Sequence, residues 1–121
     1  MVPGRPVLSH AADAVRAGGY LFVAGLLPVD GDGALVGGED VVAQAEHVLS
    51  DLGAVLETGG CGFGDVAKVS IYLTDAGDRA AVNPVRQRAF GEARPASTLV
   101  EVSALAIPGA KIEIDAIAVL Q

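Results

Sequence analysis

The chain has 121 residues, of which 51% are hydrophobic and 19% are charged, and its net charge at pH 7 is −7. An acidic protein repels the phosphates of nucleic acids and forgoes counterion release, so this composition argues against a nucleic-acid partner. No apolar run has the length of a membrane span and the N-terminal residues lack the apolar centre of a signal peptide, so we expect a cytoplasmic protein without a membrane partner.

Cysteine and histidine are sparse. Cys61 is the single cysteine, which excludes an internal disulfide and a paired-cysteine metal site. The two histidines, His10 and His47, form no cluster with it, so we expect neither a zinc nor an iron site. The roles of Cys61 and His10 remain open. The apolar excess is large for a single small domain, and it predicts that some apolar surface is buried between subunits.

The first third of the chain predicts short strands and turns. A short edge strand is expected at residues 7–9, followed by a turn at Gly18 and Gly19. Residues 20–24 (YLFVA) form a nearly continuous apolar run, typical of a strand that is covered on both faces. Residues 28–36 contain two Asp-Gly pairs, which favour a turn or hairpin.

A long helix is expected from Glu39, where the hydrophobic period changes from two to about 3.6. The apolar stripe consists of Val41, Ala45, Val48, Leu52, Val55 and Leu56. Gln44 and the acidic residues are assigned mainly to the opposite, polar side. Glu39 and Asp40 suit the positive N-terminus, and Gly59 and Gly60 suit the end, so the helix should have about five turns.

The glycine-rich residues 59–64 resemble a phosphate loop only superficially. They follow a helix and precede a strand, the reverse of the order that a dinucleotide or P-loop site requires. They also lack the Gly-Lys-Ser/Thr ending, so we interpret them as a connection. The strand predicted next, at residues 66–74, alternates between its two faces. One face carries Val69, Ile71 and Leu73, and the other carries Lys68, Ser70, Tyr72 and Thr74.

A second, shorter helix is predicted at residues 84–90, after a turn region at 75–82. Asn83 is a favourable N-cap and Pro84 fits the first helical position. Gly91 is expected to end this helix.

Two strand-like runs, joined by a turn at Pro108 and Gly109, occupy residues 95–119. The second run has period two, with Ile112, Ile114, Ala116 and Ala118 on one face and Lys111, Glu113 and Asp115 on the other. The predicted order is therefore β, β, long α, β, short α, β, β. This order predicts an α+β fold, in which two helices pack on one face of a mixed β-sheet.

Four segments resemble the RidA family, also called the YjgF/UK114 family. They are residues 24–29 (AGLLPV), 60–75 (GCGFGDVAKVSIYLTD), 95–104 (PASTLVEVSA) and 111–119 (KIEIDAIAV). The resemblance implies a single RidA-like domain over 1–121 with a YjgF-like, chorismate-mutase-like fold. It further implies a homotrimer in which three sheets enclose a barrel-like core, with a small-molecule pocket at each subunit boundary.

The resemblance also implies a chemistry. Active members of the family hydrolyse reactive enamines and imines such as 2-aminoacrylate to 2-keto acids and ammonia, with no metal or organic cofactor. Their Pro-Ala-Arg signature holds the substrate carboxylate through a bidentate guanidinium, which a hydroxyl does not reproduce. In this chain Ser97 replaces that arginine, Leu99 replaces a nearby cysteine, and Leu8 or Ala11 stands where the family has an aromatic residue.

Glu113 matches the acidic residue that directs the attacking water in the family, so it is the candidate catalytic residue. Asp115, on the same face, is interpreted as a structural hydrogen-bond acceptor. The positions that the resemblance implies for substrate binding are Ser97, Thr98, Leu99, Asn83, Gly25 and Ala24. Whether Arg16 or Arg94 replaces the missing arginine is left open.

Two functions from different classes follow from these departures. The first is a deaminase for a small imine, enamine or related carbonyl compound, with a specificity different from that for 2-aminoacrylate. The alternative is a non-catalytic trimer that binds a small metabolite or a partner protein. A nuclease activity is also associated with the family by name, and the acidic charge argues against it.

Overall fold

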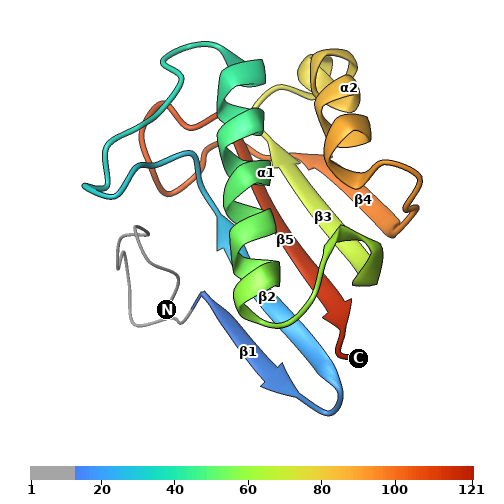
Figure 1. Ribbon diagram of the computed structural model, residues 1–121. Coiled ribbons are helices and arrows are strands. Elements are labelled where there is room, and N and C mark those ends of the chain that lie inside the picture. Colours follow the sequence, from blue (N-terminus) through green and yellow to red (C-terminus); the bar gives the residue numbers. More distant parts are fainter. Residues whose placement is uncertain (1–12) are drawn as a thin grey trace.

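A five-stranded mixed sheet is the framework of the computed structural model, which describes residues 13–121 (Figure 1). The strands are β1 (Ala14–Ala17), β2 (Tyr20–Leu26), β3 (Val66–Leu73), β4 (Ala96–Glu101) and β5 (Ile112–Val119). Their order across the sheet is β1-β2-β5-β3-β4, and only the β3–β4 pair is parallel. Helices α1 (Val41–Thr58) and α2 (Arg79–Phe90) pack on one face. The expected α+β architecture is therefore confirmed.

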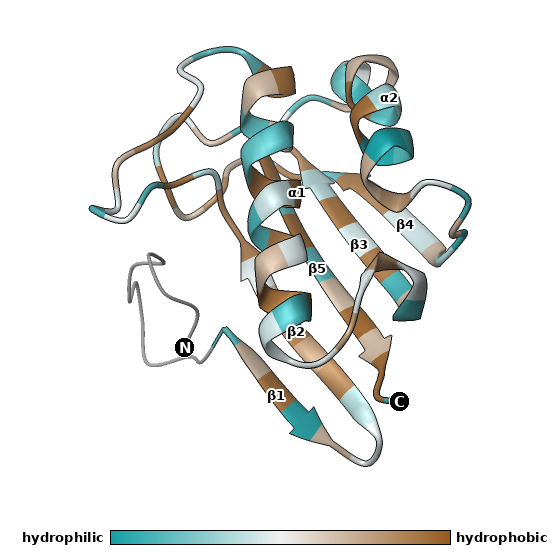
Figure 2. Cartoon of the chain, viewed as in Figure 1, coloured by the Kyte–Doolittle hydropathy of each residue, from teal (hydrophilic) through white to brown (hydrophobic). Residues whose placement is uncertain are grey.

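The core lies between the sheet and α1, as the apolar stripe predicts. All six residues of the stripe are buried, together with the inward-facing residues of β3 and β5. Figure 2 shows apolar residues along the strands that run beneath α1. Asp40 is the N-cap, and its Oδ1 accepts hydrogen bonds from the backbone N–H groups of Val42 and Ala43 at 2.9 and 3.3 Å. Gly60, with φ +83°, follows the end of the helix.

The assignment of Gln44 to the polar side of α1 was wrong, because its side chain is fully buried. Its Nε2 donates to the carbonyls of Gly38 and Gly109 at 2.8 and 3.1 Å, and its Oε1 accepts from the N–H of Lys111 at 2.7 Å. A buried amide is stable when its donors and acceptor are all paired. These hydrogen bonds hold the loops at Gly38 and at Gly109 against α1, and the loop at Gly109 leads directly into β5.

The prediction for the start of the second helix was also wrong. The short 3₁₀ helix η2 (Ala76–Asp78) leads directly into α2, which begins at Arg79. Asn83 is therefore not an N-cap, and Pro84 lies inside the helix. Because proline has no backbone N–H, α2 lacks one helical hydrogen-bond donor at this position. The consequence is that Asn83 and the residues one turn later share a helical face.

A hairpin begins the described part of the sheet. Strand β1, which the sequence pattern did not predict, pairs with β2 across Gly18 and Gly19, whose φ values are +59° and +84°. The strand expected at residues 7–9 lies outside the described residues. The glycine-rich residues 59–64 connect α1 to the 3₁₀ helix η1 (Phe63–Asp65) and then to β3, as expected.

The last two strands of the chain, β4 and β5, are not neighbours in the sheet. The predicted turn is present, with Gly109 at φ +84° and the N–H of Ala110 donating to the carbonyl of Ile107 at 3.0 Å. Strand β3 nevertheless lies between β4 and β5. Strand β4 is therefore an edge strand, and α2 forms the crossover between the parallel strands β3 and β4.

The face of the sheet opposite the two helices carries several exposed apolar side chains in the described part of the chain. Five large hydrophobic side chains lie there: Val15 (54% exposed), Tyr20 (45%), Phe22 (43%), Val100 (41%) and Val119 (39%). Strand register places all five on this face, since Val15 is paired with Phe22, Tyr20 with Val119, and Val100 with Tyr72. We call this surface the open face. Within residues 13–121, neither helix has the length and apolar character needed to cross a membrane.

Candidate functional site

Glu113 lies on the open face of β5, opposite Tyr72 of β3. Its side chain is partly buried, and this burial, together with the negative charge of Asp115, raises the pKa of the Glu113 carboxyl. A carboxyl whose pKa is raised toward neutral pH exchanges a proton more readily than an ordinary glutamate does. The position thus suits a general acid or base.

A β-bulge in the neighbouring strand makes room for this carboxylate. Val23 pairs with Ala116 and Leu26 pairs with Ile114, so the two intervening residues of β2, Ala24 and Gly25, oppose one residue of β5. A Cβ at Gly25 would collide with Glu113 Oε2 and would stand 2.9 Å from Glu113 Cδ. Glycine is thus the residue that permits this approach.

Asp115 has a structural partner. The hydroxyl of Tyr72 donates a hydrogen bond to Asp115 Oδ2 at 3.0 Å. This hydrogen bond, with burial, raises the pKa of the Tyr72 hydroxyl. Asp115 is therefore the hydrogen-bond acceptor that the sequence predicts, and its charge also acts on Glu113.

The residues predicted on β4 divide between the two faces of the sheet. Ser97 is paired with Val69 and Leu99 with Ile71, and both partners belong to the core beneath the helices. Ser97 and Leu99 therefore face the layer of α2. Thr98 lies on the open face, where the Lys68 ammonium donates a hydrogen bond to its hydroxyl. Within one chain, Ser97 and Glu113 consequently lie on opposite faces.

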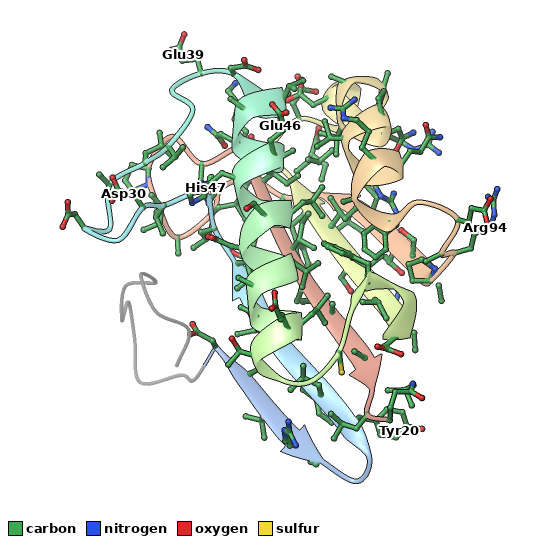
Figure 3. All side chains as sticks on the ribbon, in the orientation of Figure 1. Tyr20, Asp30, Glu39, Glu46, His47 and Arg94 are labelled. Atoms are coloured by element: carbon green, nitrogen blue, oxygen red, sulfur yellow. The ribbon has the colours of Figure 1, made fainter. Side chains whose placement is uncertain are left out.

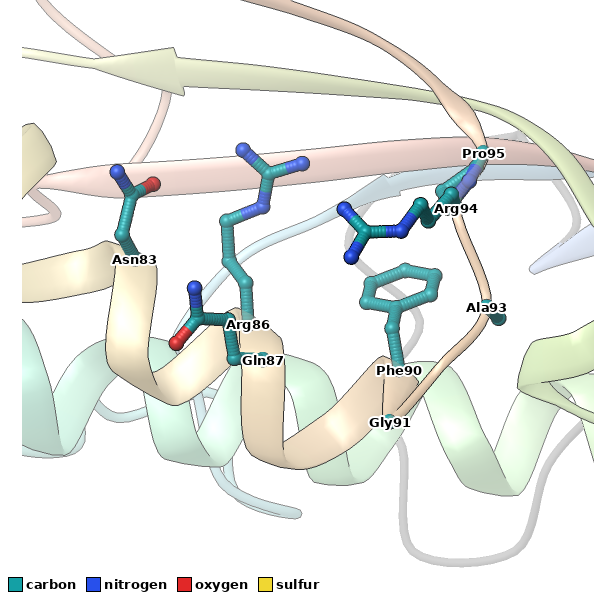
Figure 4. A pocket seen from close by; sticks show the side chains of 8 residues that line it. All are labelled: Asn83, Arg86, Gln87, Phe90, Gly91, Ala93, Arg94 and Pro95. Carbon is teal, nitrogen blue, oxygen red and sulfur yellow. The ribbon is translucent and has the colours of Figure 1, made fainter.

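A cleft lies between α2 and the segment that connects it to β4 (Figure 4). Its volume is about 450 Å³. Asn83, Arg86, Gln87 and Phe90 line it from one face of α2, at the spacing i, i+3, i+4 and i+7. Arg94 and Pro95 line it from the connection to β4. The side chain of Asn83 thus lies in a cleft rather than at a helix end.

Arg86 is the residue of this region that the sequence analysis missed. Its Nη2 donates a hydrogen bond to Ser97 Oγ at 2.8 Å. Burial and the nearby positive charge of Arg79 lower the pKa of the Arg86 guanidinium. Arg86 lies one helical turn after Asn83. Both side chains share one face of α2 because the helix begins at Arg79, before Asn83.

The other arginines considered as replacements have different surroundings. Arg16 Nη2 donates to the carbonyl of Gly59 at 2.7 Å, where a positive group stabilises the C-terminus of α1. Arg94 is exposed and lines the cleft, and Figure 4 shows its side chain extending in the direction of Arg86. Arg94 thus shares a cleft with Arg86, and Arg16 does not line it.

Two remaining polar candidates have structural positions. Cys61 is buried, and its burial raises the pKa of the thiol, which disfavours a nucleophilic thiolate. His47 Nε2 lies 2.7 Å from the carbonyl of Val29 and 3.3 Å from Asp51 Oδ2. Figure 3 shows His47 on the side of α1 near the segment of Asp30, away from Arg94. His10, Leu8 and Ala11 lie outside the described residues. Among residues 13–121, no three His, Cys, Asp or Glu side chains are arranged to hold a metal ion.

Comparisons with known proteins give relatives that match most of the chain. The family model described as endoribonuclease L-PSP matches residues 5–120. Protein DfrA of Myxococcus xanthus is 49% identical over 105 residues, which cover 87% of this chain and 79% of that protein. A 2-iminobutanoate/2-iminopropanoate deaminase of Capra hircus is 37% identical over 89% of this chain and 78% of its own. The 3-aminoacrylate deaminase RutC of Acinetobacter baylyi is 36% identical over 93% of this chain and 89% of its own.

Solved structures have the same fold. RidA from the Antarctic bacterium Psychrobacter sp. PAMC 21119 superposes with a TM-score of 0.90 at 30% identity, over 99% of this chain and 96% of that chain. The crystal structure of E. coli TdcF with bound serine superposes with a TM-score of 0.89 at 29% identity, over 100% of this chain and 96% of that chain. The likeness thus extends over the whole arrangement of sheet and helices.

Proposed function

Because the chain belongs to the RidA family, also described as the endoribonuclease L-PSP family, we propose that it hydrolyses small reactive imines or enamines, with Glu113 as the catalytic acid and base. The observation that carries this proposal is the partly buried Glu113 carboxyl, whose pKa is raised and whose position depends on the absence of a side chain at Gly25. Two relatives named as deaminases of imines and enamines support the same reaction class.

The proposed reaction has two steps, the attack of water and the loss of ammonia. The Glu113 carboxylate takes a proton from water as the oxygen attacks the carbon of the protonated C=N bond, and a neutral carbinolamine forms. The protonated carboxyl then gives its proton to the amine, and as the C–N bond breaks the carbinolamine hydroxyl returns a proton to the carboxylate, so that a carbonyl compound and ammonia leave. A single carboxyl serves both steps best when its pKa lies near the working pH, and burial moves Glu113 in that direction.

We further propose a homotrimer with the reaction site at each subunit boundary. The open face supports this assembly, because its exposed apolar side chains need a covering surface in water. The two groups of candidate residues support it too. Glu113 and Gly25 lie toward the open face, whereas Ser97 and Asn83 lie toward α2, so a second copy would supply the group that one chain lacks.

The proposed specificity differs from that for 2-aminoacrylate. Ser97 offers one neutral hydroxyl where the family signature has a bidentate guanidinium. From β4, Leu99 is proposed to shape the site on the side of Ser97, and Thr98 on the side of the open face, where Glu113 lies. A small ligand with an amino and a carboxylate group remains compatible with this family, since the structural relative TdcF is described with bound serine.

A turnover assay tests the proposed function. Imines would be generated in place from neutral amino acids with an amino-acid oxidase, and the release of ammonia would be followed. Among the imines made in this way, we expect slow turnover of the smallest 2-imino acids and faster turnover of at least one other. We expect loss of all activity in Glu113→Gln. Hydrolysis by Glu113→Gln at the wild-type rate would exclude the proposed role of Glu113.

The alternative is a non-catalytic trimer that binds a small metabolite or a partner protein. The observation that favours it is the replacement of the signature arginine by Ser97. It predicts unchanged ligand affinity in Glu113→Gln and no hydrolysis by either protein. Nuclease activity, despite the name of the family, is disfavoured by the net charge of −7. The cytoplasmic location stays a prediction from the sequence.

A further inference from the structure

We propose that Arg86 and Arg94 form an anion-binding subsite that replaces the arginine absent at position 97, and that this subsite binds the carboxylate of a small organic acid. The inference deepens the proposed function, and it rests on that function for the identity of the reacting C=N group. The binding of the carboxylate itself can be measured without any reaction.

The first argument is that Arg86 pairs with a neutral hydroxyl and with no carboxylate of the described residues. Its guanidinium has several N–H donors, and the contact that the structure shows for it uses one nitrogen, on the neutral hydroxyl of Ser97. Within the described residues no carboxylate pairs with Arg86, whereas Arg88, on the same helix, lies 4.0 Å from the carboxylate of Glu46. A partly buried guanidinium without an acidic partner is costly, and an anion would offset that cost.

The second argument is the concentration of positive charge. The chain has 15 acidic and 8 basic residues, so an arginine cluster is unexpected. Arg79 is nonetheless close enough to lower the pKa of Arg86, and Arg94 lines the same cleft. Like charges repel one another, so an anion bound to Arg86 would offset the repulsion from Arg79, and Arg94 lines the same cleft. Two arginines thus line one cleft of a protein whose net charge is −7.

The third argument is the size and lining of the cleft. Its volume of about 450 Å³ exceeds what a carboxylate group alone would fill and falls in the range of small-ligand pockets. The amides of Asn83 and Gln87 provide neutral hydrogen-bonding groups, and Phe90 and Pro95 provide apolar surface. This combination suits a small organic acid better than an inorganic ion, because part of the lining is apolar.

The guanidinium of Arg86 lies beside the residue-97 side chain, although it extends from α2 rather than from β4. A carboxylate bound to Arg86 would therefore lie close to position 97, where the signature arginine is absent.

Binding of stable carbonyl acids tests the subsite. The probes are 4-oxopentanoate, 2-oxobutanoate, the uncharged 2-pentanone and inorganic phosphate, measured by titration calorimetry at low salt. We expect both acids to bind more tightly than the uncharged 2-pentanone. Arg86→Gln should weaken binding of the acids about ten- to a hundredfold. Arg86→Lys should weaken it less, and Arg88→Gln, the matched control on the exposed side of α2, should bind like the wild type.

Equal affinity of folded Arg86→Gln and wild-type protein for both acids would overturn the proposal, and Arg86→Lys and Arg94→Gln give the same test if Arg86→Gln does not fold. Tighter binding of phosphate than of either acid would overturn the assignment to carboxylates. The two proposals fail separately. Carboxylate binding that depends on Arg86, in a protein that hydrolyses no imine, would remove the proposed function alone. Imine hydrolysis with carboxylate affinity unchanged in Arg86→Gln would remove the subsite alone.

Discussion

Gly25 lies against the carboxylate of Glu113, so closely that a Cβ at this glycine would stand 2.9 Å from Glu113 Cδ. The contact joins two distant parts of the sequence, the bulge of β2 and the polar side of β5. A bulge is a frequent device for placing a side chain beside an active site. The position of the candidate catalytic carboxylate therefore depends on a residue that has no side chain.

Gly25→Ala should displace the Glu113 carboxylate and lower kcat about ten- to a hundredfold, because a displacement of about 1 Å at a reacting group can have that effect. Gly64→Ala is the matched control, since a Cβ at Gly64 would meet nothing within 4 Å. Steady-state kinetics on the best imine substrate measures the effect. An unchanged kcat in Gly25→Ala would separate this contact from catalysis.

Glu113→Gln should raise the thermal unfolding temperature at neutral pH. The folded state raises the pKa of Glu113, so the group favours folding most at acidic pH, and this contribution is lost as the pH rises through the folded-state pKa. The glutamine variant does not ionise, and its advantage should shrink as the pH falls below the ordinary glutamate range. Thermal melts from acidic to neutral pH check this, with the exposed Glu57→Gln as the control. An advantage that grows on acidification would contradict the burial argument.

Asp115→Asn should move the acidic limb of the pH–rate profile to lower pH. The negative charge of Asp115 contributes to the raised pKa of Glu113, so its removal lowers that pKa. The asparagine oxygen can still accept the hydrogen bond of Tyr72, which preserves the local geometry. The measurement is kcat/KM against pH for the wild type and the variant. Loss of all activity, as expected for Glu113→Gln, would instead assign Asp115 a direct catalytic role.

Gln44→Ala should destabilise the protein by roughly 2–4 kcal/mol, because it leaves buried backbone groups without their hydrogen-bond partners. Urea unfolding at a fixed protein concentration measures the change, since any assembly makes stability depend on concentration. Ser50→Ala, at an exposed position of the same helix, should change the free energy of unfolding by no more than about 0.5 kcal/mol. Equal stabilities of the two variants would show that the loops do not depend on Gln44.

The elements with a strong hydrophobic period were predictable from the sequence. The stripe of α1 and the alternation of β5 each bury one face, and burial determines which residues point inward. The start of α2 was not predictable in the same way, because the Asn83-Pro84 pair is a favourable start signal and only tertiary contacts extend the helix back to Arg79. Gln44 shows the same limit, since its burial depends on loops that are distant in sequence.

The candidate site was predictable on β5 and less so near α2. Glu113 follows from the alternation of its strand and from the family resemblance. Its partial burial and the charge of Asp115 raise the pKa of its carboxyl. Arg86 had no comparable signal, because its relation to Ser97 depends on the packing of α2 against an edge strand. The absence of an arginine at position 97 is evident from the sequence, but the guanidinium beside it is not.

Mixed assemblies test the central claim, that one copy contributes Glu113 and another contributes the Arg86 cleft. Glu113→Gln and Arg86→Gln chains would be co-expressed with different tags, and the assemblies that carry both would be assayed for imine hydrolysis. In a trimer that carries both kinds of chain, one of the three boundaries has both groups intact, so we predict about one third of wild-type activity from two nearly inactive parents. Activity of the mixed assemblies no higher than the average of the two parents would contradict a site shared between copies.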